Sequence, residues 1–493
     1  MSPAPAYDAT WESVATHRAP AWYEDAKLGV FLHWGLYSVP AWAPRVPDIQ
    51  TILRRHGPAW MLRHNPYAEW YANTVQLPDS PTRRHHDETF GPDFPYDGFV
   101  ALFEKASSEA DMAALAAVCR QAGARYVVLT TKHHDGYCLW PTALHHPVKG
   151  AYHSTRDLVG DLTGAVRDQG MRMGLYYSGG YDWPYNAVVM DSLADALLAG
   201  PTGAGYAAYA AAHVGELVDR YRPSVLWNDI GWPVAGDLPR LFADYYNAVE
   251  DGVVNDRWLQ SSRRGPVFDA LVRVAGAAIE RGWRLIPDRY KQLTFPGVRH
   301  ADFTTAEYAQ HDRIVKRKWE ATRGVGHSFG ANHNEAPADV ISSTELVRLL
   351  VDVVAKNGNL LIGVGPAPDG TLPEWQIAPL AGLGRWLEVH GEAIYGTRPW
   401  AVPSTTTSEG TEVRFTAAGD DLYATLLDSP GSRHVSLRGV AAGELRRVEL
   451  LGRATALDWS VRDGSVSVTF PERLPVRPAH ALRMTPASAV RPL

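Results

Sequence analysis

Short apolar runs recur through the first three quarters of this chain, and each is followed by a polar or glycine-rich loop. The runs lie at residues 28–35, 125–136, 173–180, 224–231, 252–258 and 359–366. Between them, residues 109–123 and 206–223 carry apolar side chains at helical spacing. Because strands that alternate with helices form parallel sheets, the pattern predicts an α/β fold. The number and spacing of the units favour a (β/α)8-like TIM-type barrel over an open sheet.

Polar side chains come after the apolar residues of four runs. His33 follows "GVFL", the segment 132–135 follows "VVLT", Tyr176 follows "MGL" and Asp229 follows "SVL". In a barrel of this type the carboxyl ends of the strands meet at one face, which is where active sites lie. These side chains therefore predict a site at that face.

A change in periodicity near residue 398 predicts a second domain. The segment 397–410 is rich in Pro, Thr and Ser, and the sequence after it alternates apolar and polar residues with turn residues between the runs. Such alternation is typical of antiparallel strands. We expect a catalytic barrel over residues 1–397 and a C-terminal β-sandwich over 398–493.

Composition and charge argue against several classes of partner. A net charge of -6 and a pI near 6.3 offer no basic surface, so neither nucleic acid nor an anionic membrane is expected as a partner. No apolar run approaches the roughly 20 residues of a membrane helix. The first 20 residues lack the pattern of a secretory signal. We expect a cytoplasmic protein in which Cys119 and Cys138 are isolated buried thiols rather than a disulfide.

Aromatic residues are the other unusual component of the composition. The chain contains 17 tryptophans and 22 tyrosines, most of which are expected to fill the core. Flat aromatic faces are also the surfaces on which sugar rings stack, because sugar C–H groups meet the negative face of the ring. A sugar substrate is therefore compatible with the composition.

Asp229 lies in "VLWNDIGWP" (225–233), between two tryptophans. On a strand, Trp227 and Asp229 share one face and Asn228 points the other way. One interpretation is that Asp229 caps the helix that follows, although Gly231 and Pro233 make such a cap awkward. The other is that Asp229 is an ionised carboxylate, held in an aromatic-walled pocket to attack a carbon atom.

The stretch "TTKHHDGYCLWPT" (130–142) contains His133 and His134. With His33 and Glu69 they suggest a metal site, but adjacent histidines at a strand end diverge, and no HxxxH or HxH pair accompanies them. Imidazole both donates and accepts hydrogen bonds, so recognition of hydroxyl groups suits these residues better. Purely structural histidines remain a third interpretation.

Several further candidates are not specific when taken singly. Glu307, in "ADFTTAEYAQ", has the context of a helix start with Thr304 and Thr305 as caps, and alone it is typical of a first-turn acid. The others are Trp60, Glu69, Trp70, Arg257 and Phe329.

Taken together, eight short motifs resemble the α-L-fucosidases of glycoside hydrolase family 29. In the order of that family they are "FLHWGLYSVPAW", "NPYAEWY", "TTKHHDGYCLWPT", "LYYSGGYDW", "LWNDIGWP", "VNDRW", "TAEY" and "GHSFGAN". Residues 357–373 are similar to the last barrel strand of the family, and the resemblance covers most of residues 20–400.

The resemblance implies an exo-acting, retaining α-L-fucosidase that needs no cofactor or metal. It implies that Asp229 is the nucleophile and Glu307 the acid/base, which requires two carboxyl groups about 5–5.5 Å apart. The substrate implied is a fucosylated oligosaccharide or glycoside. The residues that would contact the sugar are His33, Trp60, Glu69, Trp70, His133, His134, Tyr176, Arg257 and Phe329.

The chain departs from compact relatives in a long insertion around residues 259–300, with a predicted helix over 268–282. The insertion lies between Arg257 and Glu307, and Glu280 and Glu335 are the alternatives for the acid/base. Two other functions stay open: a metal-dependent hydrolase built on His33, His133, His134 and Asp135, and a non-catalytic fucose-binding protein. A homo-oligomer is also compatible with the sequence, which does not determine the linkage or the leaving group.

Overall fold

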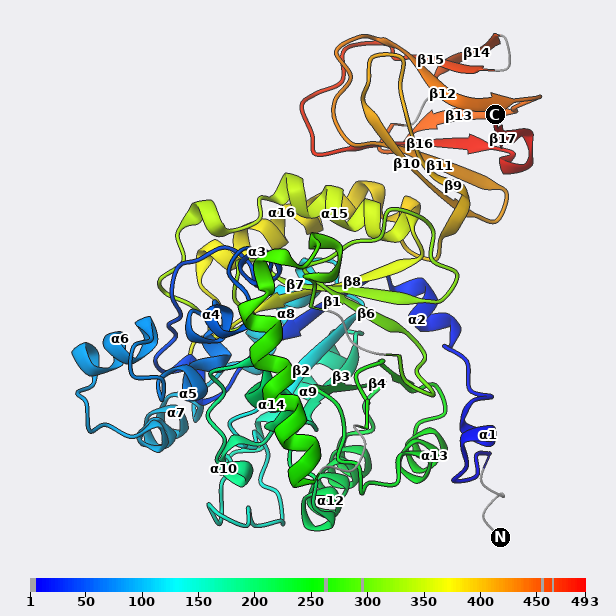
Figure 1. Cartoon of the computed structure of the whole chain (residues 1–493). Coiled ribbons are helices and arrows are strands. Elements are labelled where there is room, and N and C mark those ends of the chain that lie inside the picture. The colour runs from blue at the N-terminus through cyan, green and yellow to red at the C-terminus, as the bar shows by residue number, and fades with distance from the viewer. Residues whose placement is uncertain (1–5, 261–264, 294–296, 454–455, 463–464) are drawn as a thin grey trace.

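Eight parallel strands form one curved sheet with helices around it (Figure 1). The computed structural model describes residues 6–260, 265–293, 297–453, 456–462 and 465–493. Hydrogen-bonded neighbours follow the order β5-β4-β3-β2-β1-β8-β7-β6. The strands are β1 (Leu28–Leu32), β2 (Tyr126–Lys132), β3 (Arg172–Ser178), β4 (Val225–Asp229), β5 (Val253–Val254), β6 (Thr304–Glu307), β7 (Trp319–Gly324) and β8 (Gly358–Val364). The predicted TIM-like barrel is confirmed.

Helices cover the outside of the sheet, and several begin at a side chain that caps them. Asp111, Asp157, Asp237 and Ser342 each accept a hydrogen bond from a main-chain N–H of the first turn. Such caps fix where a helix starts, and therefore how long the preceding loop is. The main helices are α8 (Met112–Gln121), α9 (Leu158–Asp168), α12 (Ala204–Tyr221), α13 (Leu238–Ala248), α14 (Pro266–Arg281), α15 (Ser343–Ala355) and α16 (Glu374–His390).

Three of the connections after the strands are long, and each carries helices of its own. The connection after β1 contains α3 (Ile49–His56) and α4 (Pro58–Arg63), and the one after β3 contains α11 (Leu193–Leu198). The connection after β5 contains α14, which starts two residues before the predicted helix and crosses the front of the barrel in Figure 1. Two parts of the predicted insertion, 261–264 and 294–296, lie outside the described residues.

Strands β6 and β7 were not predicted from the sequence. Their residues, "TTAE" and "WEATRG", lack the continuous apolar run of the other strands. Strand β7 is nevertheless one of the barrel strands. It can bury the carboxylate of Glu320 because that carboxylate accepts hydrogen bonds from Tyr23, Tyr126 and Trp227. The expectation that Glu307 starts a helix is wrong: it ends strand β6, which pairs in parallel with β7.

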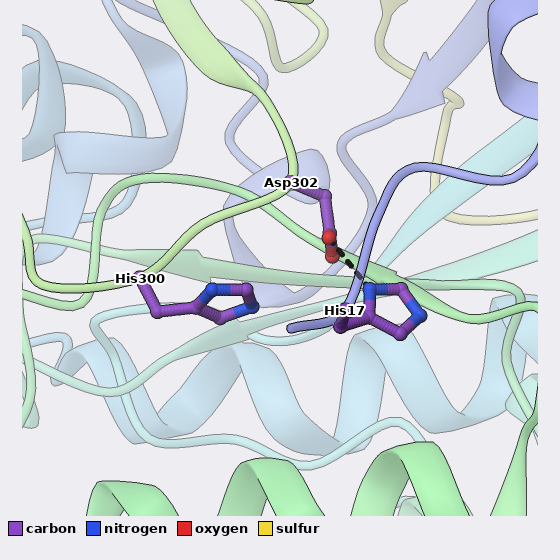
Figure 2. A group of neighbouring side chains, drawn as sticks. All are labelled: His17, His300 and Asp302. Atoms are coloured by element: carbon purple, nitrogen blue, oxygen red, sulfur yellow. Dashed lines mark hydrogen bonds and ion pairs between the residues drawn. The ribbon is translucent and has the colours of Figure 1, made fainter. Parts of the chain in front are cut away.

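The seam between β5 and β6 is joined by a cluster of polar side chains (Figure 2). The main-chain N–H of Asp302 donates to the carbonyl of Val254 (2.9 Å), and the Asp302 carboxylate accepts from the Val254 N–H (2.8 Å). The same carboxylate bonds Nδ1 of His17 (2.7 Å) and the Tyr246 hydroxyl (2.9 Å), which also bonds His300 (2.7 Å). The cluster therefore ties the N-terminal segment to the barrel at the place where the two end strands of the sheet order, β5 and β6, meet.

The C-terminal domain consists of two antiparallel sheets that enclose a separate apolar core, as expected of a sandwich. Their orders are β13-β16-β11-β10-β9 and β14-β15-β12-β17. The strands are β9 (Arg398–Thr406), β10 (Glu412–Ala418), β11 (Asp421–Leu426), β12 (His434–Ala442), β13 (Arg447–Leu450), β14 (Asp458–Arg462), β15 (Ser465–Thr469), β16 (His480–Thr485) and β17 (Val490–Pro492).

The sandwich packs over α15 and α16 (Figure 1). Arg414 Nε donates to Asp352 of α15 at 2.6 Å, and the Trp386 indole of α16 donates to the Ala479 carbonyl at 3.0 Å. These contacts fix one outer face of the barrel to the second domain.

Cys119 and Cys138 are both buried and free, as predicted. Among the described residues, no helix combines the length and the apolar character that crossing a membrane would require.

Candidate active site

A cavity of about 480 Å³ opens at the carboxyl ends of the barrel strands. Its floor comes from positions at or just after those strand ends, as the barrel geometry predicts. Most of the residues that the sequence singled out meet here. They are His33, Glu69, Trp70, His133, His134, Tyr176, Asp229, Arg257, Glu307 and Phe329.

Asp229 ends β4 and lies on the cavity wall beside Trp227, while Asn228 points away to bond the carbonyls of Gly231 and Arg257. One Asp229 oxygen accepts from Arg257 Nη1 (3.0 Å) and from the Ile230 N–H (2.9 Å). The other accepts from the Tyr176 hydroxyl at 3.0 Å. Asp229 makes these contacts instead of capping a following helix, so the capping interpretation is wrong.

Glu307 bonds the other terminal nitrogen of the Arg257 guanidinium. Its Oε2 accepts from Arg257 Nη2 at 2.7 Å, and its Oε1 accepts from the Tyr67 hydroxyl at 2.7 Å. One arginine therefore holds both carboxylates close together by charge-assisted hydrogen bonds. Burial alone would lower the pKa of Arg257, but the charges of Glu307 and Asp229 outweigh it and raise that pKa.

Each carboxylate is followed by a residue with a left-handed backbone. Ile230 has φ 63° and Tyr308 has φ 45°, conformations that cost free energy for residues other than glycine. Strained residues of this kind persist where the surroundings fix them, and they cluster at functional sites. At both positions the strained residue directly follows the carboxylate at a strand end, where the chain turns out of the barrel.

Two tyrosines present hydroxyl groups to the carboxylates. Burial and the adjacent Asp229 raise the pKa of Tyr176, and burial and Glu307 raise the pKa of Tyr67. Both phenols therefore stay protonated and act as hydrogen-bond donors. Tyr67 was not singled out from the sequence, although it lies inside the "NPYAEWY" motif.

The three histidines form one neutral group. Burial, with a smaller contribution from His134, lowers the pKa of His33 to about 3, and burial lowers the pKa values of His133 and His134 well below the usual range. The Nδ1 atoms of His33 and His133 are buried and have no hydrogen-bond partner among the described residues. Buried polar atoms normally have partners, so these rings are suited to a polar ligand.

The expectation that His133 and His134 diverge is wrong. Their ring centroids lie 4.0 Å apart and both rings line the cavity. Strand β2 ends at Lys132, so the alternation of side chains that would separate the two rings no longer applies beyond it.

Glu69 and Phe329 also belong to the cavity wall. Glu69 accepts from the Gly330 N–H at 2.9 Å, and burial raises the pKa of its carboxyl to about 7. The Phe329 ring stacks on His33 with centroids 4.9 Å apart. Trp70 meets His134 edge-on at 5.5 Å. The wall therefore combines an acceptor for hydroxyl groups with apolar aromatic surface.

The structure does not bring Trp60 to the cavity. Its ring is sandwiched between His56 and His64, with centroids 4.1 and 4.0 Å away, and it is not among the described residues that line the cavity. His56 ends α3 and Trp60 lies in α4, so the turn at Gly57 brings the first pair of rings together, whereas His64 directly follows α4, four positions after Trp60. The aromatic ring at the cavity's outer wall is instead that of Trp283, from the insertion.

The two alternatives to Glu307 have other partners. Glu280 Oε1 accepts from the main-chain N–H of Leu193 at 2.7 Å, at the start of α11. Glu335 accepts from the N–H groups of His327 and Ser328 and orders that loop. Neither is among the described residues that line the cavity, whereas Glu307 is.

The buried network beneath Asp229 was missed as well. Glu320 accepts from the Trp227 indole at 3.0 Å, and the Trp227 ring lies 4.8 Å below the Arg257 guanidinium and stacks on Tyr176. No sequence signal marked Glu320, because a carboxylate inside a barrel strand normally argues against that strand. The network orients both side chains that hold Asp229.

Within the described part of the chain, the group of side chains close enough to share a metal ion is His17, His300 and Asp302. These residues belong to the seam between β5 and β6 and already have partners there: His17 bonds Asp302, His300 bonds Tyr246, and Asp302 also bonds Tyr246 and the Val254 N–H. The metal hypothesis based on His33, His133, His134 and Asp135 is not supported by this geometry.

Comparisons with known proteins point to one family. The family model described as Alpha-L-fucosidase matches residues 2–392. Tissue alpha-L-fucosidase of Bos taurus is 30% identical over 96% of this chain and 88% of its own length. Alpha-L-fucosidase of Dictyostelium discoideum is 31% identical over 81% of this chain and 76% of its own.

Solved structures agree with the sequence comparisons. A Thermotoga maritima alpha-fucosidase in complex with fucose is 38% identical, covers 97% of this chain and 100% of its own, and superposes with a TM-score of 0.81. A Thermotoga maritima alpha-L-fucosynthase, also 38% identical, covers 98% and 100% with a TM-score of 0.84. On this evidence, the chain belongs to the alpha-L-fucosidase family.

Proposed function

We propose that this protein is an exo-acting, retaining α-L-fucosidase that removes terminal α-L-fucosyl groups from oligosaccharides or glycosides. The observation that carries the proposal is the pair Asp229 and Glu307, joined by Arg257 on the wall of one cavity. Retaining enzymes need close carboxyl groups, about 5–5.5 Å apart, whereas inverting enzymes separate them by about 6.5–9.5 Å. Two carboxylates that share one guanidinium suit the first arrangement.

In the first step an Asp229 oxygen attacks the anomeric carbon of the fucosyl group. The bond from that carbon to the leaving oxygen breaks, and the leaving oxygen takes a proton from Glu307. In the second step Glu307 takes a proton from water, the water oxygen attacks the same carbon, and the bond to Asp229 breaks. Two inversions give fucose with the configuration of the substrate.

Glu307 must give a proton to the leaving oxygen in the first step, whereas without substrate its Oε2 is paired with Arg257 Nη2 at 2.7 Å. We therefore propose that the bound sugar separates Glu307 from Arg257, and that Arg257 then stays with Asp229. The Tyr67 hydroxyl, 2.7 Å from Glu307, keeps the carboxyl oriented during this exchange.

The remaining side chains match the two chemical characters of fucose. Phe329 and Phe31, whose ring centroids lie 6.2 Å apart, offer an apolar surface for the C6 methyl group. The histidines and Glu69 supply donors and acceptors for the hydroxyl groups. The solved structure with fucose bound belongs to a relative that is 38% identical, which supports the same sugar here.

The substrate partner is thus a fucosylated glycan or glycoside. Assembly into a homo-oligomer and a cytoplasmic location both stay predictions from the sequence.

The test is hydrolysis of an aryl α-L-fucoside by the wild type, after dialysis against EDTA, and by an Asp229→Ala variant. We expect the wild type to turn over without added metal and the variant to lose several orders of magnitude in kcat while fucose binding stays measurable by calorimetry. Full activity in the variant would contradict the role of Asp229. Activity that returned only with zinc or manganese would favour a metal-dependent hydrolase, and fucose binding without turnover by the wild type would favour a binding protein.

A further inference from the structure

The cavity has a polar floor and an apolar rim. Most floor residues lie at or just after strand ends, whereas the rim consists mainly of residues from the three long connections after β1, β3 and β5, with residues 232–234 after β4 beside them. Large apolar side chains of the rim are Leu53, Met61, Leu193, Leu197, Leu259 and Trp283. Because an exo-acting enzyme holds the terminal sugar on the floor, the group attached to that sugar has to pass this rim.

Two rim leucines are unusually exposed for their type. Leu197 of α11 is 55% exposed and Leu259 is 38% exposed, and both line the cavity. Exposed apolar side chains that gather around a cavity mark a binding surface more often than scattered ones do. Here they face the path that the leaving group must take.

The polar side chains of the described rim are Asn65, Thr202, Asp256 and Gln292, fewer than its large apolar ones. Asn65 Oδ1 already accepts from the Tyr67 N–H at 2.9 Å, and Asp256 already accepts from Thr305 through its N–H (3.0 Å) and hydroxyl (2.8 Å). A leaving sugar would lose hydrogen bonds with water and regain few of them here. An apolar leaving group would lose none.

The insertion holds the rim in place. On α14, Glu280 accepts from the Leu193 N–H and Arg273 bonds Asp195, which together anchor α11. A Cβ added to Gly276 would come within 3.1 Å of the Ala194 Cβ, so the two helices approach closely at this point.

Two more contacts anchor the end of the insertion. The Trp283 indole donates to the Leu53 carbonyl at 3.0 Å. Gln50 bonds both the N–H and the carbonyl of Leu293 and also the carbonyl of Glu307. The rim is therefore attached to the strand that carries the acid/base and is preformed.

We propose that these three connections form an apolar subsite for the leaving group, and that the preferred substrates are α-L-fucosides of apolar alcohols. The inference rests on the proposed fucosidase activity and names its substrate class. Each methylene that the rim removes from water strengthens the interaction with the leaving group.

The experiment uses n-alkyl α-L-fucosides from methyl to butyl, whose leaving alcohols differ little in acidity. For the wild type we expect kcat/KM to rise roughly two- to fourfold per methylene. The rise is expected to flatten in a Leu197→Gln, Leu259→Gln double variant. Leu271→Gln is the matched control, because Leu271 is exposed on α14 and is not among the described residues that line the cavity; it should behave as the wild type.

Two further substrates separate the possible failures. Fucosyl fluoride has a leaving group too small to reach the rim, so all variants should hydrolyse it at the wild-type rate. If the wild type did not hydrolyse it, both the proposed function and this inference would be overturned. Hydrolysis of the fluoride with a flat alkyl series, or with a fucosyl-galactose disaccharide preferred over butyl fucoside, would overturn the subsite alone.

Discussion

Arg257 is the residue on which both candidate catalytic carboxylates depend. It bonds Asp229 and Glu307 through its two terminal nitrogens and lies over the Trp227 ring. Three floor residues were thus predictable as separate sequence motifs, but their connection through one guanidinium was not, because they are distant in the sequence. The prediction that Trp60 lines the cavity is wrong for the converse reason: the residue lies near a motif in the sequence, yet its ring packs between those of His56 and His64.

The acid/base role of Glu307 predicts an effect that depends on the leaving group. In a Glu307→Gln variant, kcat/KM for methyl fucoside should fall by roughly 10²–10⁴, because the alcohol needs a proton to leave. Fucosyl fluoride needs no such proton and should lose far less in a burst-phase assay of the first step.

Glu280→Gln and Glu335→Gln serve as comparisons for that experiment. Both should keep the wild-type ratio between the two substrates, whatever they do to stability. Selective loss of methyl fucoside hydrolysis in either variant would move the acid/base role to that residue.

Glu69 gives the site a pH dependence. Burial raises the pKa of this carboxyl to about 7, so the free enzyme gains a proton there as the pH falls through about 7. The protonated group loses acceptor capacity for a sugar hydroxyl, and kcat/KM should decrease on the acid side. In a Glu69→Gln variant we expect a lower maximum without that decrease, measured from pH 5 to 9. An unchanged acid limb in the variant would show that another group controls it.

At the scale of elements, the sequence missed two strands that carry important carboxylates of the site. Strand β6 ends in Glu307, and β7 carries Glu320 beneath Trp227. Apolar periodicity finds strands buried among apolar neighbours, and it fails where a strand buries carboxylates that accept hydrogen bonds from tyrosine and tryptophan. Strands β1 to β4 and β8 were predictable because they are buried and consist largely of apolar residues.

The seam between β5 and β6 predicts a stability effect. Asp302→Ala removes the acceptor of the Val254 N–H, of Tyr246 and of His17 in a buried place. We expect the free energy of unfolding of the barrel to decrease by about 2–4 kcal/mol, visible as a lower Tm in calorimetry. Asp302→Asn, which keeps one acceptor oxygen, should lose less. A Tm of the wild type that fell to the variant's value in EDTA would contradict this account, because it would mean that an ion occupies the cluster.

At the scale of the whole molecule, the barrel and the sandwich followed from periodicity, and the location of the site followed from polar residues after the strands. The shape of the cavity did not follow, since its rim depends on how α11, α14 and α3 pack on one another. Such contacts between distant segments leave no periodic trace in a single sequence. The sequence motifs therefore indicated fucose as the sugar of the substrate, but they did not indicate which leaving group is attached to it.

The central claim is that Asp229 attacks the sugar and that the reaction retains configuration. The most direct measurement follows the hydrolysis of an aryl α-L-fucoside by proton NMR and identifies the anomer of fucose released before mutarotation. We expect α-fucose to appear first. Initial release of β-fucose would contradict the claim, because a single inversion would make Asp229 a base that activates water.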